Sequence, residues 1–331
     1  MKKSIAIIIP ALNEGDTIAD IVRQCAQSLD ANRFEPSVIV IDDGSTDRTE
    51  ELAASAGART ISHPVNMGVG KAFQTGLAEA LKTGADIVVN IDADGQFDPT
   101  RIPDLIQPIL DGRADFTTAS RFKDPLLVPK MPSIKLWGNR MMSRLISKIA
   151  RKKFYDVSCG FRAYNREAAL QLNLWGNFTY TQESILDLVI KGMRMEEVPM
   201  KIQGVRGTGK SKVASNLWRY GFKALKIILH TYRDYWPSHF FGWISLPFLG
   251  SGTSLIIFLF VHRFWAGSFS PHIWAGFTGG GLFALGTVIL IIGLAGETLK
   301  RIRLNQEMLL YYHRRNLYKK NGDNALPSID V

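Results

Sequence analysis

Three short stretches of this sequence place carboxylates and turn residues directly after an apolar run: residues 10–14, 42–47 and 92–96. The last reads Asp92-Ala93-Asp94-Gly95-Gln96. Side chains two residues apart in an extended segment point the same way, so Asp92 and Asp94 can converge on one target. With the Gln96 carbonyl, these oxygens suit a hard cation such as Mg²⁺ or Mn²⁺, which shares its coordination shell with substrate phosphates. The pattern predicts a metal site for a phosphate-bearing ligand.

Each stretch taken alone also fits a capped turn. Asp47 with Glu50 three residues later resembles a capping box, and Asp-Gly is common turn chemistry. Three acidic strand ends at one edge of the same sheet favour a functional site over three unrelated turns.

The segments that must position these residues alternate between strand and helix. Apolar runs at 4–10, 36–43, 58–63 and 85–92 are separated by helical patterns at about 16–29, 47–56 and 69–81. This alternation predicts an α/β fold with a mainly parallel sheet, whose ligands bind beyond the carboxyl ends of the strands. The basic, apolar start resembles a signal peptide, but no cleavage site follows and acids interrupt it at once, so we expect a buried first strand.

The C-terminal third predicts two membrane-spanning helices. Residues 240–261 and 273–296 carry no charge, and about 20 apolar residues suffice to cross a bilayer. Basic residues flank the pair (Arg219, Lys223, Lys226 and Arg233 before it; Lys300, Arg301 and Arg303 after it), whereas the turn has only Arg263. The positive-inside rule then places both termini and the large N-terminal part in the cytoplasm. We expect the membrane to be the cell inner membrane. A two-helix hairpin often packs against copies of itself, which leaves a homo-oligomer open.

The net charge of +10 requires an anionic partner, either nucleic acid or a membrane. Residues 133–154 carry seven Lys or Arg and no acid, with Trp, Leu and Met at helical spacing. A basic amphipathic helix of this kind indicates a membrane-surface element, and a core helix with a solvated basic face is the alternative. No zinc-finger, homeodomain or RNP-type pattern accompanies the charge, so nucleic acid is not expected.

The stretch GVRGTGKSK at 204–212 satisfies the phosphate-loop pattern, but no sheet can follow it before the bilayer. We interpret it as a glycine-rich basic flap over an anion. Lys71, at the start of the 69–81 helix, could face a diphosphate.

The motifs PALNE, VIVIDDGSTD, NMGVGKAFQTG and DADGQ, in this order, resemble inverting family-2 glycosyltransferases of the GT-A fold, over about residues 4–215. ASRF at 119–122, DVSCGFRAYNR at 156–166, YTQES at 180–184 and R-x-x-G-x-S-K at 206–212 are similar to polyprenyl-phosphate glycosyltransferases of the dolichyl-phosphate mannose synthase type. The resemblance implies a GT-A catalytic domain with a C-terminal transmembrane hairpin. It also implies transfer of a sugar from a nucleotide-sugar to a polyprenyl phosphate such as undecaprenyl phosphate.

The resemblance implies roles position by position. The base and ribose would be held by Pro10, Leu12, Glu14, Ile41 and Asp43. The diphosphate and metal would be met by Asp92, Ala93, Asp94 and Gln96, with Arg121 at the transfer point and Arg206 and Lys212 closing over the phosphates; Glu183 would lie near the sugar. Relatives carry an Arg four residues before a Ser for the lipid phosphate, but here Asn139 precedes Ser143. Arg140, Ser143 and Arg144 are therefore the candidates for acceptor binding.

We expect the catalytic domain at 1–215, juxtamembrane helices at 216–238, the membrane hairpin at 239–297 and a cytoplasmic helix and tail at 298–331. A processive polysaccharide synthase of the same superfamily is one alternative, but QGVRG lacks the Trp of that group's QxxRW motif. A non-catalytic membrane-anchored binding protein is the other. No motif specifies the sugar.

Overall fold

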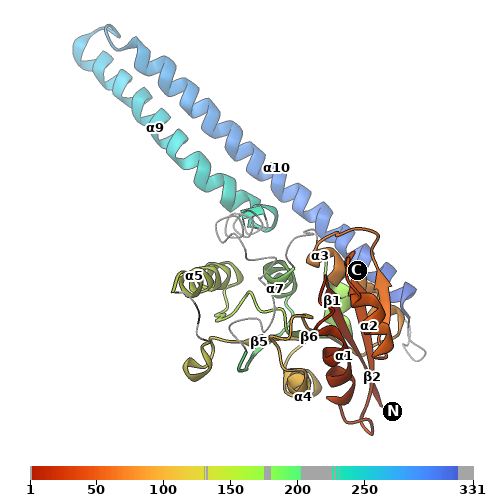
Figure 1. The fold of residues 1–331 in the computed structure, drawn as a ribbon. Coiled ribbons are helices and arrows are strands. Elements are labelled where there is room, and N and C mark those ends of the chain that lie inside the picture. The colour runs from red at the N-terminus through yellow and green to blue at the C-terminus, as the bar shows by residue number, and fades with distance from the viewer. Residues whose placement is uncertain are drawn as a thin grey trace. The chain divides into compact units, whose positions relative to one another are not determined.

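The computed structural model describes residues 2–129, 131, 133–174, 180–202, 226, 229–230 and 232–319 (Figure 1). The chain divides into two compact units. The sheet unit comprises Met1–Ile228 and Leu310–Val331, and the hairpin unit comprises Leu229–Leu309.

Within the described residues, the sheet unit has a seven-stranded sheet of order β3-β2-β1-β4-β6-β5-β7. The strands are β1 (Lys3–Ala11), β2 (Phe34–Asp42), β3 (Arg59–Ser62), β4 (Ile87–Asn90), β5 (Phe116–Ser120), β6 (Arg162–Asn165) and β7 (Met195–Pro199). β6 is antiparallel to both of its neighbours, and the other pairs are parallel. The predicted α/β fold with a mainly parallel sheet is confirmed.

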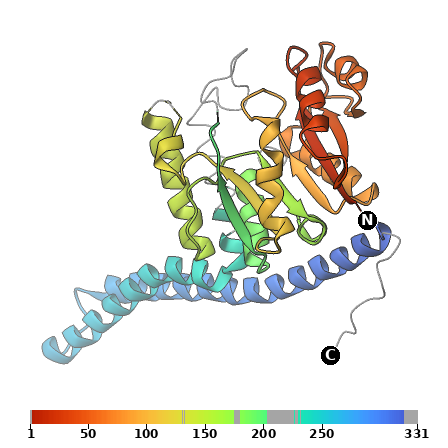
Figure 2. The same ribbon diagram turned by 90° about the horizontal axis from the view of Figure 1, so that it is seen from below.

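Helices cover both faces of this sheet: α1 (Ile18–Gln27), α2 (Thr49–Ser55), α3 (Val69–Lys82), α4 (Ile102–Leu110), α5 (Ser133–Ala150), α6 (Arg166–Gln171) and α7 (Thr181–Ile190). β1 shows why two layers form. Its Ile5, Ile7 and Ile9 pack with α1 and α4, whereas Ala6 and Ile8 pack with α3, because successive side chains of a strand point to opposite faces. Figure 1 shows α4 and α5 on opposite sides of β5 and β6, and Figure 2 shows α1 and α4 in front of the strands. The apolar start of the chain is thus a buried central strand, as expected.

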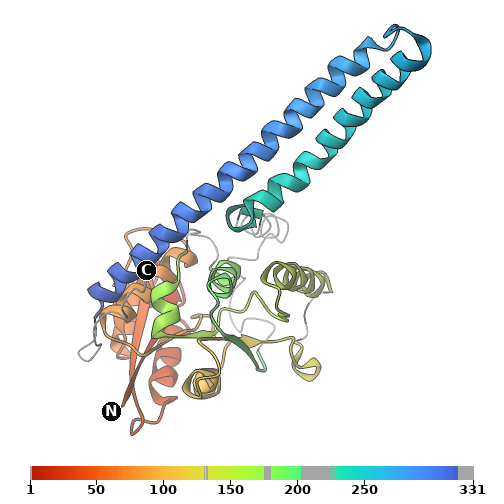
Figure 3. The same ribbon diagram turned by 180° about the vertical axis from the view of Figure 1, so that it is seen from behind.

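The hairpin unit consists mainly of α9 (Pro237–Ala266) and α10 (Ile273–Leu317), which lie side by side (Figure 3). Both are long and apolar enough to cross a membrane. Glycines make their close approach possible: a Cβ on Gly252 would lie 2.6 Å from the backbone nitrogen of Phe283, and one on Gly286 would lie 2.8 Å from Cγ of Leu249. Small residues of this kind let helix backbones pack closely in a bilayer.

The two helices are longer than the predicted spans. α10 continues through the charged residues after Glu297 to Leu317 without a break. This segment has neither Gly nor Pro and is rich in Leu and Arg, which favour helix. The C-terminal helix that we expected as a separate element is the end of α10.

The last residues of α10, from Leu310, belong to the sheet unit. Nη1 of Arg314 donates to the carbonyls of Leu170 (3.3 Å) and Leu172 (2.8 Å) and to Oδ1 of Asn173 (3.0 Å). These carbonyls end α6, and a cation is favourable at a helix C-terminus. Burial of the guanidinium lowers the pKa of Arg314. The C-terminal segment is therefore a folded part of the sheet unit.

Replacing Arg314 by Ala should uncover the C-terminus of α6. A hydrogen bond to a charged group contributes about 1.5–3 kcal/mol, so we expect local opening to become easier by roughly 2 kcal/mol. Hydrogen exchange of the Leu172 and Asn173 amides in the full-length protein measures this opening. Lys319→Ala, which removes an exposed cation of the same segment, should leave exchange unchanged. Equal exchange in both variants would contradict the capping role.

Candidate active site

The predicted acidic stretches meet at one edge of the sheet. β2, β1 and β4 are parallel neighbours, and the register pairs Pro10 with Ile41 and Ile8 with Asn90. The residues that follow these strands therefore emerge side by side. β5 and β7 run the same way and β6 runs oppositely, so Arg121 and the residues before β6 reach the same edge.

The loops after β1 and β2 are tied to each other by Asn13. Its backbone nitrogen donates to Oγ of Ser45 (2.8 Å), and its Oδ1 accepts from the backbone nitrogen of Thr46 (2.7 Å). Asn13 has a positive φ of 51°, a conformation that Asn tolerates better than most residues. Leu12 and Glu14 flank it, both half-buried. These hydrogen bonds fix the surface on which a nucleotide base and ribose are predicted to bind.

The carboxylate of Asp43 is buried and organises the loop before α3. It accepts from the backbone nitrogens of Met67 (3.0 Å) and Gly68 (2.8 Å) and contacts Nδ1 of His63 at 2.7 Å. Nε2 of His63 lies 3.0 Å from Oγ1 of Thr75 on α3. Asp43 thus fixes the start of the helix that carries Lys71, and a direct contact with the nucleotide remains a prediction.

Asp92 and Asp94 follow β4. Asp92 is half-buried and Asp94 is buried, and Oδ1 of Asp94 accepts from the backbone nitrogen of Gln96 (3.1 Å). The loop is held from outside by Oγ1 of Thr17, which donates to the carbonyl of Ala93 (2.6 Å).

The loop at residues 92–96 is the predicted binding site of a Mg²⁺ or Mn²⁺ ion. Within the described residues there is no group of three or more His, Cys, Asp or Glu side chains placed for a metal. Two carboxylates and the Gln96 amide would leave several positions for other ligands, which is how Mg²⁺ is bound in sites that also hold substrate phosphates. Gly160 lies against this loop, because a Cβ there would approach Oδ2 of Asp92 to 2.6 Å. The donor set and the space kept at Gly160 fit such an ion.

A cluster of buried side chains lies next to Asp92. Nδ2 of Asn90 donates to the carbonyl of Gly160 (2.8 Å) and to the hydroxyl of Tyr180 (2.7 Å). The Tyr180 ring stacks on Phe73, with centroids 4.2 Å apart. Burial, and then the nearby charge of Asp92, raise the pKa of Tyr180 well above its usual range. Tyr180 is therefore neutral and acts as a fixed dipole beneath the loop.

Arg121 lies at this edge as half of a buried ion pair. Its Nε donates to Oδ2 of Asp156 (2.6 Å) and its Nη2 to Oδ1 (2.9 Å), and Nη2 also donates to Oγ of Ser158 (2.8 Å). Burial alone would raise the pKa of Asp156, but the charge and hydrogen bonds of Arg121 outweigh it, so this pKa lies below its usual range. Planar, bidentate contacts of this kind are the strong form of a charged hydrogen bond.

Glu197 of β7 supports the same turn, because its Oε1 accepts from the backbone nitrogen of Asp156 (2.8 Å). Burial is the main reason that the pKa of Glu197 is raised.

Glu183 lies in the first turn of α7 and is buried. The helix start is anchored by Arg162, a fully buried side chain whose Nη1 donates to the carbonyl of Thr181 (2.7 Å) and to Oγ of Ser184 (2.6 Å). A role for Glu183 near the sugar stays a prediction.

The predicted acceptor residues on α5 separate into two kinds. Arg140 and Arg144 are exposed. Ser143 is buried, and its Oγ donates to the carbonyl of Tyr155 (3.0 Å). A contact of the Ser143 hydroxyl with the acceptor therefore stays a prediction. Arg206 and Lys212 lie outside the described residues.

Several residues that build the site had no role in the sequence interpretation. The motif DVSCGFRAYNR was recognised as a family signature, but its spacing does not reveal which side chains pair with Arg121. No pattern in the sequence indicates that His63 is the partner of Asp43. The residues concerned are His63, Asp156, Ser158, Gly160, Arg162 and Glu197.

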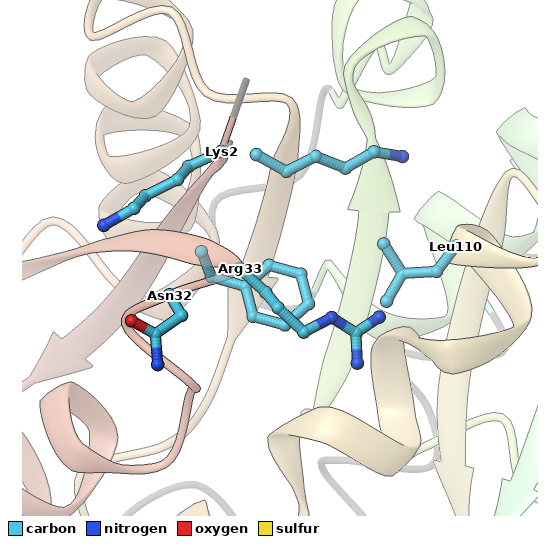
Figure 4. A pocket seen from close by; sticks show the side chains of 6 residues that line it. Lys2, Asn32, Arg33 and Leu110 are labelled. Atoms are coloured by element: carbon cyan, nitrogen blue, oxygen red, sulfur yellow. The ribbon is translucent and has the colours of Figure 1, made fainter.

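A hollow of about 600 Å³ lies elsewhere, at the amino-terminal ends of β1 and β2 (Figure 4). It is lined by Lys2, Lys3, Asn32, Arg33, Phe34 and Leu110. Since Lys3 and Phe34 begin their strands, this hollow is at the end of the sheet opposite Asp92 and is not part of the site.

The sequence profile of glycosyl transferase family 2 matches residues 6–172. The chain therefore belongs to glycosyltransferase family 2, and its sheet unit has the GT-A fold of such enzymes.

Two relatives illustrate the match. The UDP-N-acetylglucosamine–dolichyl-phosphate N-acetylglucosaminyltransferase of Methanococcus voltae is 33% identical over 183 residues, which cover 50% of this chain and 71% of that protein. Glycosyltransferase AglJ of Haloferax volcanii is 27% identical over 305 residues, which cover 92% of this chain and 96% of that protein.

A solved structure shares the fold. Glucosyl-3-phosphoglycerate synthase of Mycobacterium tuberculosis, in complex with Mn²⁺, UDP and glucosyl-3-phosphoglycerate, has a TM-score of 0.55 and 24% identity, and covers 69% of this chain and 80% of that chain.

Gly160→Ala should displace the carboxylate of Asp92, since the new Cβ would lie 2.6 Å from Oδ2 and 2.9 Å from Oδ1. Disturbing the support of a metal ligand costs about 10–100-fold in affinity, and we expect a loss of this size in Mn²⁺ binding, measured by titration with UDP or GDP present. Gly138→Ala, where no atom lies within 4 Å, should bind normally. Unchanged affinity in Gly160→Ala would show that Asp92 does not depend on this contact.

Asp156→Asn should weaken the fold most at neutral pH. Because the folded-state pKa of Asp156 is lowered, its ionised form contributes stability above the unfolded value of about 3.9, and this is lost as pH falls below that value. Breaking a buried pair costs about 3 kcal/mol. Chemical unfolding at pH 7 and pH 3.5 should give a difference between the two proteins that shrinks on acidification. A difference independent of pH would contradict an ionised Asp156.

Proposed function

We propose that the protein is an inverting, metal-dependent glycosyltransferase that transfers a sugar from a nucleotide-sugar to a polyprenyl phosphate at the cytoplasmic face of the membrane. The observation that carries the proposal is that the Asp92–Asp94 loop and the Arg121–Asp156 pair lie at the same edge of the sheet, in a chain with two helices that could cross a bilayer. The relatives named above support it, because one acts on dolichyl phosphate by name and the other matches the chain through the hairpin.

Different loops at this edge of the sheet would bind different parts of the nucleotide-sugar. The loops held by Asn13 and Asp43 would carry the nucleotide, and Asp92, Asp94 and Gln96 would hold a divalent cation against its diphosphate. The cation, when bound, would offset charge that develops on the leaving diphosphate. Arg121 follows β5 at the same edge, and its guanidinium would add to this charge stabilisation.

The acceptor would supply its own nucleophile. A phosphate monoester has a second pKa near 6, so it is already ionised at neutral pH. One of its oxygens would attack the anomeric carbon as the bond from that carbon to the diphosphate oxygen breaks, and the nucleoside diphosphate would leave with the electron pair. Direct displacement inverts the anomeric centre. The protein would contribute position and charge stabilisation, without deprotonating an alcohol.

Orientation follows from the flanking basic residues. With Arg233 before α9 and Lys300, Arg301 and Arg303 after the second span, both ends of the hairpin would lie on the cytoplasmic side. The sheet unit would then meet cytosolic nucleotide-sugars.

The direct test uses purified full-length protein with Mg²⁺ or Mn²⁺, a panel of radiolabelled UDP- and GDP-sugars, and three acceptors: undecaprenyl phosphate, undecaprenol and the soluble phosphate 3-phosphoglycerate. We expect label from one donor in an organic-extractable, mild-acid-labile product, with undecaprenyl phosphate only. Label on 3-phosphoglycerate alone would replace the lipid acceptor with a soluble one. Aqueous polymer would favour a processive synthase.

Asp94→Asn should lower kcat by about 100-fold or more, because loss of a carboxylate ligand removes several kcal/mol of charge stabilisation. The matched control is Asp98→Asn, an exposed carboxylate four residues along the same loop, which should keep activity within about twofold. Both variants should unfold like the wild-type protein. Normal turnover of Asp94→Asn with added Mg²⁺ would remove the metal assignment.

A further inference from the structure

α5 is attached to the segment before β6 by a polar stripe. Asn139, Ser143 and Ser147 lie four residues apart and therefore on one face of the helix. Oγ of Ser143 donates to the carbonyl of Tyr155 (3.0 Å), and Oγ of Ser147 accepts from the backbone nitrogen of Phe154 (2.9 Å). Oδ1 of Asn139 accepts from Oγ of Ser158 (3.1 Å). The position of α5 is thus coupled to residues 154–158.

This segment contains two groups that hold Arg121 through its side chain, Asp156 and Ser158. Asp156 binds the guanidinium with two oxygens, and Ser158 accepts from its Nη2 at 2.8 Å. Asn139 is therefore two hydrogen bonds away from Arg121, through a single hydroxyl.

The Ser158 hydroxyl has one proton and two acceptors within reach. Oδ1 of Asn139 lies at 3.1 Å and Oδ1 of Asp156 at 3.2 Å. A proton donated to Asn139 is not donated to Asp156. If Asn139 moves away, the Ser158 hydroxyl can donate only to Asp156. The hydrogen bonds among Asp156, Ser158 and Arg121 then become stronger.

The other face of α5 is exposed and combines apolar with basic side chains: Trp137, Arg140, Met141, Arg144 and Lys148. Such a face fits an anionic lipid headgroup or the phosphate of a lipid acceptor. A ligand there would set the position of the helix that also carries Asn139.

We propose that Asn139 is a positioning residue for Arg121: through Ser158 it makes the availability of the guanidinium depend on the position of α5. The inference rests on the proposed function, in which Arg121 acts at the transfer point and α5 meets the acceptor. It explains a departure in the sequence, since an Asn at this position accepts a hydrogen bond that an Arg could not.

The test is a double-mutant cycle in the full-length protein with Asn139→Ala, Ser158→Ala and the double variant. One hydrogen bond corresponds to about tenfold in rate. We expect Asn139→Ala to lower kcat/KM for undecaprenyl phosphate about tenfold and to leave KM for the nucleotide-sugar within twofold of wild type, about the scatter of such measurements. The double variant should be no slower than Ser158→Ala alone.

The matched control is Ser147→Ala, which removes a hydrogen bond from the same stripe but does not touch Ser158. Its effect should add to that of Ser158→Ala, as expected for groups without a shared partner. If Asn139→Ala also added fully to Ser158→Ala, or had no effect on the acceptor parameters, the positioning role would be overturned.

A second readout does not depend on the acceptor. The rate at which phenylglyoxal modifies Arg121, whose side chain is 20% exposed, can be followed by peptide mass spectrometry without substrates. Asn139→Ala should slow this modification in the wild-type background and leave it unchanged in the Ser158→Ala background. If Asn139→Ala slowed the modification but the wild-type protein transferred no sugar to undecaprenyl phosphate, the link between Asn139 and Arg121 would stand and the lipid acceptor would be rejected. If Asn139→Ala changed the modification rate equally in both backgrounds, the link between Asn139 and Arg121 would be rejected.

Discussion

The buried ion pair between Arg121 and Asp156 is the interaction on which the arrangement of the site depends. Asp156 has no exposed surface, and Arg121 meets it with two guanidinium nitrogens. A carboxylate in this position is tolerated only while its partner and further donors satisfy it. The pair therefore fixes separate segments at once: Arg121 follows β5, Asp156 precedes β6, Glu197 of β7 holds the Asp156 amide, and α5 holds the residues beside it.

The loops after β1 and β2 use polar groups in the same way. The Asp43 carboxylate accepts hydrogen bonds from two backbone amides and contacts His63. Asn13 joins two loops through its side chain and its backbone nitrogen. These side chains shape the loops by satisfying backbone groups that would otherwise be costly to bury. Thr17 holds the loop of Asp92 and Asp94 through the Ala93 carbonyl, and Gly160, which Asn90 holds, lies against Asp92. The carboxylate oxygens of this loop can then face a ligand.

The sheet and its acidic edge could be predicted because both follow from local patterns. The continuous apolar run from Ile5 to Ile9 in β1 indicates a strand buried on both faces, and parallel strands bring their carboxyl ends together. The partners of Arg121 could not be predicted, since Asp156 lies 35 residues away in the chain. The two residues meet because β6 is antiparallel to its neighbours in the sheet. The burial of Ser143 could not be predicted for a related reason: helical spacing shows which face of the helix it lies on, but not whether that face packs inside. The continuity of α10 was readable from the helix-favouring residues after Glu297, but the docking of Arg314 was not.

Taken together, these contacts form an edge of fixed dipoles and paired charges. Under the proposed function this edge would position two anionic reactants, the lipid phosphate would supply the ionised nucleophile, and no side chain would have to remove a proton. The most direct measurement is kcat/KM for the acceptor as a function of pH, with undecaprenyl phosphate and with an undecaprenyl phosphonate of higher second pKa. The acidic limb should move upward with the pKa of the acceptor. A limb that stays at the same pH for both acceptors would assign it to a group on the protein, such as Glu183, and would contradict a site without a catalytic base.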